Sequence, residues 1–272
     1  MKLKLIILTI TIISFNYTFS QTKELYIEYD FYFKDKLVEN KRIKLRSTDK
    51  ESLSTTERTI MVGINYNSKT GQIGERVPRT GYRYIYKNNR ANSLQYSEDV
   101  PGQRGKVFVQ ETLDQFKWKL TGKNKSILKH NCQEATTTYR GRDYVAYFTT
   151  QIPFRAAPWK FHGLPGVILE VKTTDDKIKM ASKILRIQTP SEPIKNPFSK
   201  VEFITSWDAF KEFYKKRLKQ SINRNISNLS LIKMNSEDRG RIGVGVDMKI
   251  EIIVPENGLS MDEQREAHKL KK

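Results

Sequence analysis

The chain has 272 residues and a formal net charge of +19 at pH 7, and its 38% hydrophobic and 11% aromatic residues are enough for the core of one large domain. The single cysteine, Cys132, excludes an intramolecular disulfide and a cysteine-based zinc cluster. Three histidines scattered at positions 130, 162 and 268 argue against a histidine-rich metal site, so we predict neither metal nor cofactor.

The first twenty residues have the pattern of a secretory signal peptide. Lys2 and Lys4 precede an apolar run over residues 5–15, and small residues surround a cleavage point after Ser20. The apolar run is about a dozen residues, shorter than the ~20 that span a bilayer. We therefore predict that residues 1–20 are removed on export. Residues 21–272 then form a single β-rich domain with no integral membrane span.

The next segment predicts a long, half-buried strand. Residues 24–34 alternate strictly, with Leu25, Ile27, Tyr29, Phe31 and Phe33 on the face expected to be buried. Shorter runs with turn-rich segments between them indicate an antiparallel meander, because parallel crossovers need a dozen or more intervening residues. These runs are 42–45, 59–66, 82–87, 93–97 and 106–112.

The second half continues with strands and one clear helix. Phe116, Trp118 and Leu120 are expected on one face of a strand, and residues 121–125 (TGKNK) are expected to form a turn. Residues 205–222 predict an amphipathic helix with Thr205 as its N-cap and Asp208 in capping-box position. Further strands are predicted at 142–152, 166–173, 177–188 and 244–256, and a short C-terminal helix at 260–272.

Together these elements predict a mainly β fold of the α+β class. A long, twisted antiparallel sheet is expected to curl into a half-barrel or to stack as a sandwich, with the amphipathic helix packed on it. Leu164, Pro165, Gly166 and Val167 fit a type II turn that starts a strand, with proline presetting the first central φ and Gly166 supplying a positive φ. Gly163 frees the backbone just before this turn.

The segment from Arg140 to Val171, RGRDYVAYFTTQIPFRAAPWKFHGLPGVILEV, closely resembles the signature of the GLPGLI family of exported bacterial proteins. The similarity extends over roughly residues 82–187. Val167 replaces the leucine of the family name, and Ala157 stands where similar sequences tend to have glycine. The resemblance implies a periplasmic or secreted location in a Gram-negative envelope. It implies no reaction, because the family is named for a motif.

Cationic and aromatic residues around this motif form the candidate ligand site. Guanidinium groups pair well with carboxylates and phosphates, so an anion, a peptide carboxylate or an acidic sugar is a possible ligand. The alternative is that the arginines pair with Glu134, Asp143 or Glu170 on neighbouring strands. The candidate residues are Arg140, Arg142, Arg155, Trp159, Lys160, Phe161 and His162, beside the structural turn Gly163, Leu164, Pro165 and Gly166.

Two catalytic interpretations compete with ligand binding. Cys132 as a nucleophile needs a base within hydrogen-bond reach, and His130 lies only two positions away on a strand. A hydrolase could use carboxylates such as Glu134, Asp143 and Glu170, in which case they should share a cleft and have raised pKa values.

The sequence favours a non-enzymatic binding or accessory module for an envelope or outer-membrane protein, or for a small apolar or anionic ligand. A carboxylate-based hydrolase is the alternative. The lysines are spread along the chain rather than gathered in one block, which is typical of a solvated surface. We therefore expect no nucleic-acid partner.

Overall fold

The computed structural model describes residues 23–33, 36–37, 42–62, 77–100, 103 and 105–231. Within them it contains twelve strands and one helix, which confirms the predicted mainly β fold. The elements are β1 (Glu24–Phe33), β2 (Lys36–Leu37), β3 (Ile43–Ser47), β4 (Glu51–Val62), β5 (Val77–Asn88), β6 (Ser93–Glu98), β7 (Val107–Thr112), β8 (Lys119–Ile127), β9 (His130–Tyr139), β10 (Arg142–Thr149), β11 (Val167–Thr173), β12 (Ile178–Gln188) and α2 (Trp207–Leu231). The predicted signal peptide and the elements predicted at 244–256 and 260–272 lie outside the described residues.

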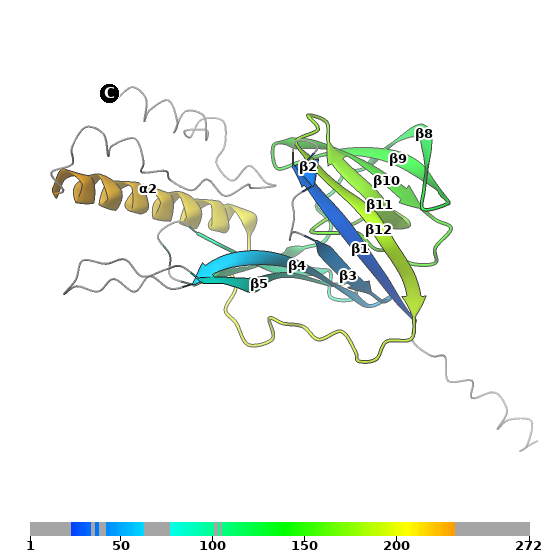
Figure 1. The fold of residues 1–272 in the computed structure, drawn as a ribbon, viewed down its shortest axis with the longest axis horizontal. Coiled ribbons are helices and arrows are strands. Elements are labelled where there is room, and N and C mark those ends of the chain that lie inside the picture. The colour runs from blue at the N-terminus through cyan, green and yellow to red at the C-terminus, as the bar shows by residue number, and fades with distance from the viewer. Residues whose placement is uncertain are drawn as a thin grey trace, which may run out of the picture.

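All the strands belong to one antiparallel sheet, and at its centre the first strand, β1, pairs with the last strand, β12. The order is β7-β6-β5-β4-β3-β1-β12-β11-β10-β9-β8, and β2 also pairs with β1. The sheet therefore consists of two meanders that spread in opposite directions from the β1–β12 pair. Figure 1 shows β3, β4 and β5 running across the lower part of the molecule and β8 to β12 on the other side of β1.

The connection between β7 and β8 requires the sheet to be strongly curved. These strands are its two outer edges, yet only residues 113–118 lie between them. Eleven strands laid flat would separate the edges by about 48 Å. The extended chain from Thr112 to Lys119 reaches at most about 25 Å. The edges therefore approach each other, although no pairing between β7 and β8 occurs among the described residues.

The core lies inside this curve. The predicted alternation of β1 is confirmed from Leu25 to Phe31, because Leu25, Ile27, Tyr29 and Phe31 are almost completely buried. The intervening side chains are partly exposed. Phe33, predicted on the same face, is only partly buried and packs against the core. The hydroxyl of Tyr29 donates a hydrogen bond to the carbonyl oxygen of Ile168 at 2.7 Å. The inner face of β1 thus packs against β11, which leads directly out of the Gly-Leu-Pro-Gly segment.

Two tight hairpins join β8, β9 and β10. Leu128 and Lys129 connect β8 to β9, and Arg140 and Gly141 connect β9 to β10. Both central residues of each turn have positive φ, between 48° and 75°, which matches the type I′ geometry that suits the twist of hairpin strands.

The prediction of a turn at residues 121–125 was wrong. This segment belongs to β8, whose pairing with β9 shifts register between Leu120 and Asn124. The glycine that suggested a turn, Gly122, has φ of 78° and lies within this irregular part of the strand. Leu120 is 63% exposed, so it does not share the buried face of Phe116 and Trp118, which pack against the core.

Helix α2 packs on the sheet through its first three turns, as predicted. Phe210 and Tyr214 are buried in the core. Ser206, not Thr205, caps the helix, since its Oγ accepts a hydrogen bond from the backbone N–H of Ala209 at 3.1 Å. The far end of the helix projects beyond the strands (Figure 1). No helix in the described part of the chain has both the length and the hydrophobicity to cross a membrane.

Candidate functional site

The Gly-Leu-Pro-Gly segment bends the chain into β11, but Gly166 has a role different from the one predicted. Gly163 has φ of 98°, whereas Gly166 does not have a positive φ, so the predicted type II turn is wrong. Gly166 is instead required by a close backbone approach. A Cβ placed there would lie 2.2 Å from the carbonyl oxygen of Thr149 on β10. The missing side chain allows β10 and the start of β11 to come together.

The loop before this segment is held in place by hydrogen bonds to its backbone carbonyls. Lys87 Nζ donates to the carbonyl oxygens of Ala157 at 2.9 Å and Phe161 at 2.6 Å. The indole N–H of Trp118 donates to the carbonyl of His162 at 2.8 Å. Ala156 forms a parallel bridge with Val167. Lys87 of β5, Trp118 just before β8 and Val167 of β11 therefore fix one loop, which makes it a rigid wall.

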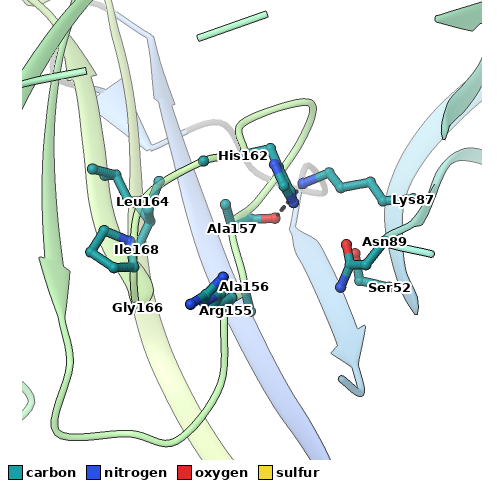
Figure 2. A pocket seen from close by; sticks show the side chains of 12 residues that line it. Ser52, Lys87, Asn89, Arg155, Ala156, Ala157, His162, Leu164, Gly166 and Ile168 are labelled. Atoms are coloured by element: carbon teal, nitrogen blue, oxygen red, sulfur yellow. Dashed lines mark hydrogen bonds between the residues drawn. The ribbon is translucent and has the colours of Figure 1, made fainter. Parts of the chain in front are cut away.

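A pocket of about 150 Å³ lies beside this loop. Figure 2 shows Lys87 extending from β5 toward the ring of His162, with Ser52 and Asn89 on the same side as Lys87. The other lining residues come from the loop and the start of β11. They are Arg155, Ala156, Ala157, Gly163, Leu164, Pro165, Gly166 and Ile168. The pocket thus lies between the two halves of the curved sheet.

Lys87 is the most perturbed cation of the pocket. Its side chain is only 2% exposed, and burial lowers its pKa to about 7. Its two hydrogen bonds go to neutral carbonyls, and no carboxylate among the described residues lies within ion-pairing distance of it. A buried ammonium without a counter-charge loses the stabilisation that water would give it, so an anion entering the pocket would restore part of that stabilisation.

His162 faces Lys87 and is also perturbed. Burial, followed by the charge of Lys87, lowers the pKa of His162 to about 4. Asp114 opposes this shift and Arg155 adds to it. At neutral pH the imidazole is therefore uncharged, and the positive charge of the site comes from the exposed Arg155 and from the protonated fraction of Lys87.

We expect the lowered pKa of His162 to account for part of the loss of protein stability in acid. Between about pH 6.5 and pH 4 the unfolded chain binds the proton and the folded chain does not, so the free energy of unfolding falls as the pH falls through this window. The loss should be roughly 1–3 kcal/mol after allowance for partial exposure. Urea denaturation of the wild type and His162→Gln at several pH values measures it. A constant difference between the two proteins would contradict the assignment.

The structure separates the predicted ligand-binding residues into three places. Arg155 and His162 line the pocket. Behind the loop, Trp159, Lys160 and Phe161 are at most 7% exposed and belong to the interior. The ring of Phe161 lies 5.0 to 6.2 Å from four aromatic rings, those of Trp159, Tyr144, Phe116 and Trp118.

Arg140 and Lys160 meet around Trp207 at the start of α2. The guanidinium of Arg140 forms a buried ion pair with Glu111 and lies 3.5 Å from the centre of the Trp207 ring. Lys160 pairs with Glu98 at 3.2 Å and lies 3.5 Å from the centre of the Tyr96 ring. These cations attach the helix to the sheet. Lys160 and Arg140 do not line the pocket.

Arg142 lies apart from both groups. Its guanidinium is 3.5 Å from Asp175 in the turn between β11 and β12. Arg140 and Arg142 therefore do pair with carboxylates, but the partners are Glu111 and Asp175 rather than the predicted Glu134, Asp143 and Glu170.

The three carboxylates suggested for hydrolysis have partners of their own. Glu134 accepts hydrogen bonds from Tyr147 at 2.7 Å and Thr121 at 2.9 Å, and the Tyr147 bond is the main cause that lowers the pKa of Glu134. Glu170 pairs with Lys125 at 2.8 Å, and Asp143 accepts a bond from Thr138. None of the three lines the pocket, and the lowered pKa of Glu134 suits a carboxylate that stays ionised rather than a general acid.

Cys132 lies in the core and has no exposed surface. Burial raises the pKa of its thiol, and its Sγ lies 3.5 Å from the backbone carbonyl of His130, not from the imidazole. A nucleophilic cysteine needs a lowered pKa and access to a substrate. The environment of Cys132 is that of a small buried apolar residue.

Comparison with known proteins identifies no family. No family model and no curated protein matches the sequence. Among the solved structures that resemble the chain are PNGF-II in space group C2, with 14% identity and a TM-score of 0.48, and PNGF-II in space group P21, with 12% identity and a TM-score of 0.49. The similarity covers 73% and 72% of this chain but 33% and 34% of the PNGF-II chains, so the chain spans about a third of their length. Similarity at this level carries no argument about function.

Sequence reasoning missed the polar wall of the pocket. Lys87, Ser52 and Asn89 were not among the candidates, because Lys87 alternates with the tyrosines of β5 and the sequence analysis identified that segment only as a strand. One signal was available: Lys87 shares its face with Ile85, an apolar residue. No group of three or more His, Cys, Asp or Glu side chains in the described ranges is arranged to hold a metal ion.

Proposed function

We propose that the protein is an exported, non-enzymatic binding module of the bacterial envelope, and that it holds a small anionic ligand in the pocket beside the Gly-Leu-Pro-Gly segment. The observation that carries the proposal is Lys87, a buried cation on the pocket wall whose hydrogen bonds go to two neutral carbonyls. Arg155 adds a second positive charge at the exposed edge of the pocket.

The rigidity of the loop supports binding. The carbonyls of Ala157, Phe161 and His162 are already engaged by side chains from β5 and from the segment before β8. A ligand therefore meets a preformed wall and bears little of the entropic cost of ordering it.

The location and family remain part of the proposal. The signal-peptide pattern at residues 1–20 and the motif at residues 140–171, similar to the GLPGLI signature, support export to the periplasm or beyond. We also propose that the curved sheet is a half-barrel rather than a sandwich, because a six-residue connection joins its two edges.

The hydrolase alternative receives less support. The carboxylates Glu134, Glu170 and Asp143 are each held by a lysine or a hydroxyl group, and none of them lines the pocket. The pKa of Glu134 is lowered, whereas a general acid at neutral pH needs a raised pKa. An envelope or outer-membrane protein as a partner stays a prediction from the sequence.

Titration with small anions tests the proposed function. We expect propionate or sulfate to bind saturably, as followed by chemical-shift changes of the amide groups around Gly163. Arg155→Gln should weaken binding about five- to tenfold, since it removes one charge-assisted contact of about 1–1.4 kcal/mol. Lys87→Met should abolish it.

The matched control is Arg142→Gln, which removes the same charge from the same motif outside the pocket. It should leave the Kd unchanged. An equal loss in Arg142→Gln and Arg155→Gln would indicate nonspecific attraction to a protein of charge +19 and would contradict the proposal. So would the absence of saturable binding by either anion.

A further inference from the structure

We propose that the pocket selects a singly charged carboxylate with a short apolar tail, and that Lys87 takes up a proton when this ligand binds. The inference rests on the proposed function, because it specifies the ligand and the chemistry of the same pocket. It follows from the two unlike walls of the pocket, its size, and the surroundings of the Lys87 ammonium.

One wall of the pocket is polar and the other is apolar, so a ligand that fits it should have a charged end and an apolar end. The wall from β4 and β5 carries the polar groups of Ser52, Lys87 and Asn89. The opposite wall is formed largely by aliphatic side chains, including Pro165 and also Leu164 and Ile168, which Figure 2 labels. An anionic head placed at Lys87 would leave the rest of the ligand against apolar carbon, where only a hydrocarbon group is stabilised by contact.

The volume of the pocket limits the length of the ligand's apolar tail. A volume of about 150 Å³ is comparable with that of an engineered cavity that takes up benzene. A carboxylate with two to four further carbons fits such a space. A nucleotide, an acidic sugar chain or a long fatty acid does not.

The donors at Lys87 favour one negative charge. A protonated amine has three N–H groups, and two of them are directed to the carbonyls of Ala157 and Phe161. One N–H remains for the ligand, and Arg155 adds its charge from an exposed position, where solvent screens it. A second negative charge on the ligand would be desolvated beside the apolar wall without a buried cation to balance it.

The groups that surround Lys87 explain why it should take up a proton when the ligand binds. The loop presents Arg155 and His162 to it, and its neighbours across the strands are the uncharged Ser52 on β4 and Leu94 on β6. Glu51 accepts a hydrogen bond from the hydroxyl of Tyr86, whose side chain lies on the face of β5 opposite to Ile85 and Lys87. Asp114 raises the pKa of His162. No described carboxylate therefore pairs with Lys87, whose pKa falls to about 7. A bound carboxylate supplies the counter-charge and raises that pKa again.

The direction of the pH dependence follows. Below about pH 7 the empty site already carries the ammonium, so the Kd should not change with pH. Above it the empty site is neutral and the occupied site is charged, so each further pH unit should weaken binding by up to tenfold until the pKa of the occupied site is reached. The ligand is bound near neutrality and released in alkali.

Calorimetric titration of the full chain with propionate and with sulfate, at about pH 6 and about pH 9, tests the inference. Propionate keeps one negative charge and sulfate two across this range. We expect propionate to bind more tightly than sulfate at pH 6 and at least tenfold more weakly at pH 9 than at pH 6. At pH 8, titrations in two buffers of different ionisation enthalpy should show uptake of up to one proton. Octanoate should bind more weakly than propionate.

Two variants separate the possible results. Lys87→Arg keeps a charge that does not titrate in this range, so a folded variant should lose the pH dependence. Arg155→Gln should bind more weakly and keep the pH dependence. If neither anion binds, the proposed function fails. If propionate binds without proton uptake, with equal Kd at pH 6 and pH 9, or no better than sulfate, this inference fails while the proposed function stands. The uptake measurement needs no variant, so it decides the question even if Lys87→Arg does not fold.

Discussion

Replacing Gly166 with alanine should destabilise the protein by about 3 kcal/mol, one of the largest effects expected of any single methyl group in this chain. The added Cβ would lie 2.2 Å from the carbonyl oxygen and 2.8 Å from the carbonyl carbon of Thr149. Both atoms are backbone, so no side chain can rotate away, and β10 and β11 would have to separate. Chemical denaturation monitored by tryptophan fluorescence measures the loss.

Gly122→Ala is the matched control for this substitution. Gly122 has φ of 78°, and no atom lies within 4 Å of the position that an added Cβ would take. Alanine there meets only the cost of a left-handed backbone, about 1–2 kcal/mol. Gly166 has no such φ. A smaller loss for Gly166→Ala than for Gly122→Ala would show that the strands can separate easily and would contradict the close-approach explanation.

Removing the carboxylate of Glu111 should cost a similar amount, about 3–5 kcal/mol. The side chains of Arg140 and Glu111 are 7% and 5% exposed. Glu111→Ala therefore leaves a buried guanidinium without its anion, and it also removes the acceptor of the Tyr96 hydroxyl. Since Arg140 also lies against Trp207, we expect loss of contact between α2 and the sheet, measurable as faster amide exchange in the first turns of the helix.

A surface ion pair provides the comparison. Lys44 and Glu57 are 2.6 Å apart, but their side chains are 37% and 34% exposed. Glu57→Ala should cost less than about 1 kcal/mol. Combining Glu111→Ala with Arg140→Met should recover part of the loss, because the unpaired charge disappears. If Glu111→Ala and Glu57→Ala cost the same, the Arg140 pair does not behave as a buried pair.

The strands were predictable because alternation is a local property. From Leu25 to Phe31 every second side chain of β1 is apolar, and those four side chains are buried. The pairing of β1 with β12 was not predictable, because Glu24 and Gln188 are separated by most of the described chain and no local pattern records it. The turn assigned to residues 121–125 failed for a related reason: glycine marks a bulge as well as a turn.

Only the loop side of the candidate site could be predicted from the sequence. The motif drew attention to Arg155 and His162, and both line the pocket. Trp159, Lys160 and Phe161 were indistinguishable from them in sequence, because burial of a loop residue depends on what covers it. Lys87 was missed since its partners Ala157 and Phe161 follow it by 70 and 74 positions. A cation on an exposed strand face and one enclosed by a distant loop have the same local sequence.

The position of β12 beside β1 has a consequence for the order of events during biosynthesis. Residues 178–188 complete the middle of the sheet, so strands on either side of it can pair through local hairpins before β12 is synthesised, but the two sides cannot be joined until then. Contacts between such distant residues slow folding. Until they form, one side of β1 remains available to other chains. A nascent chain that stalls before residue 178 is therefore the species in which we expect aggregation.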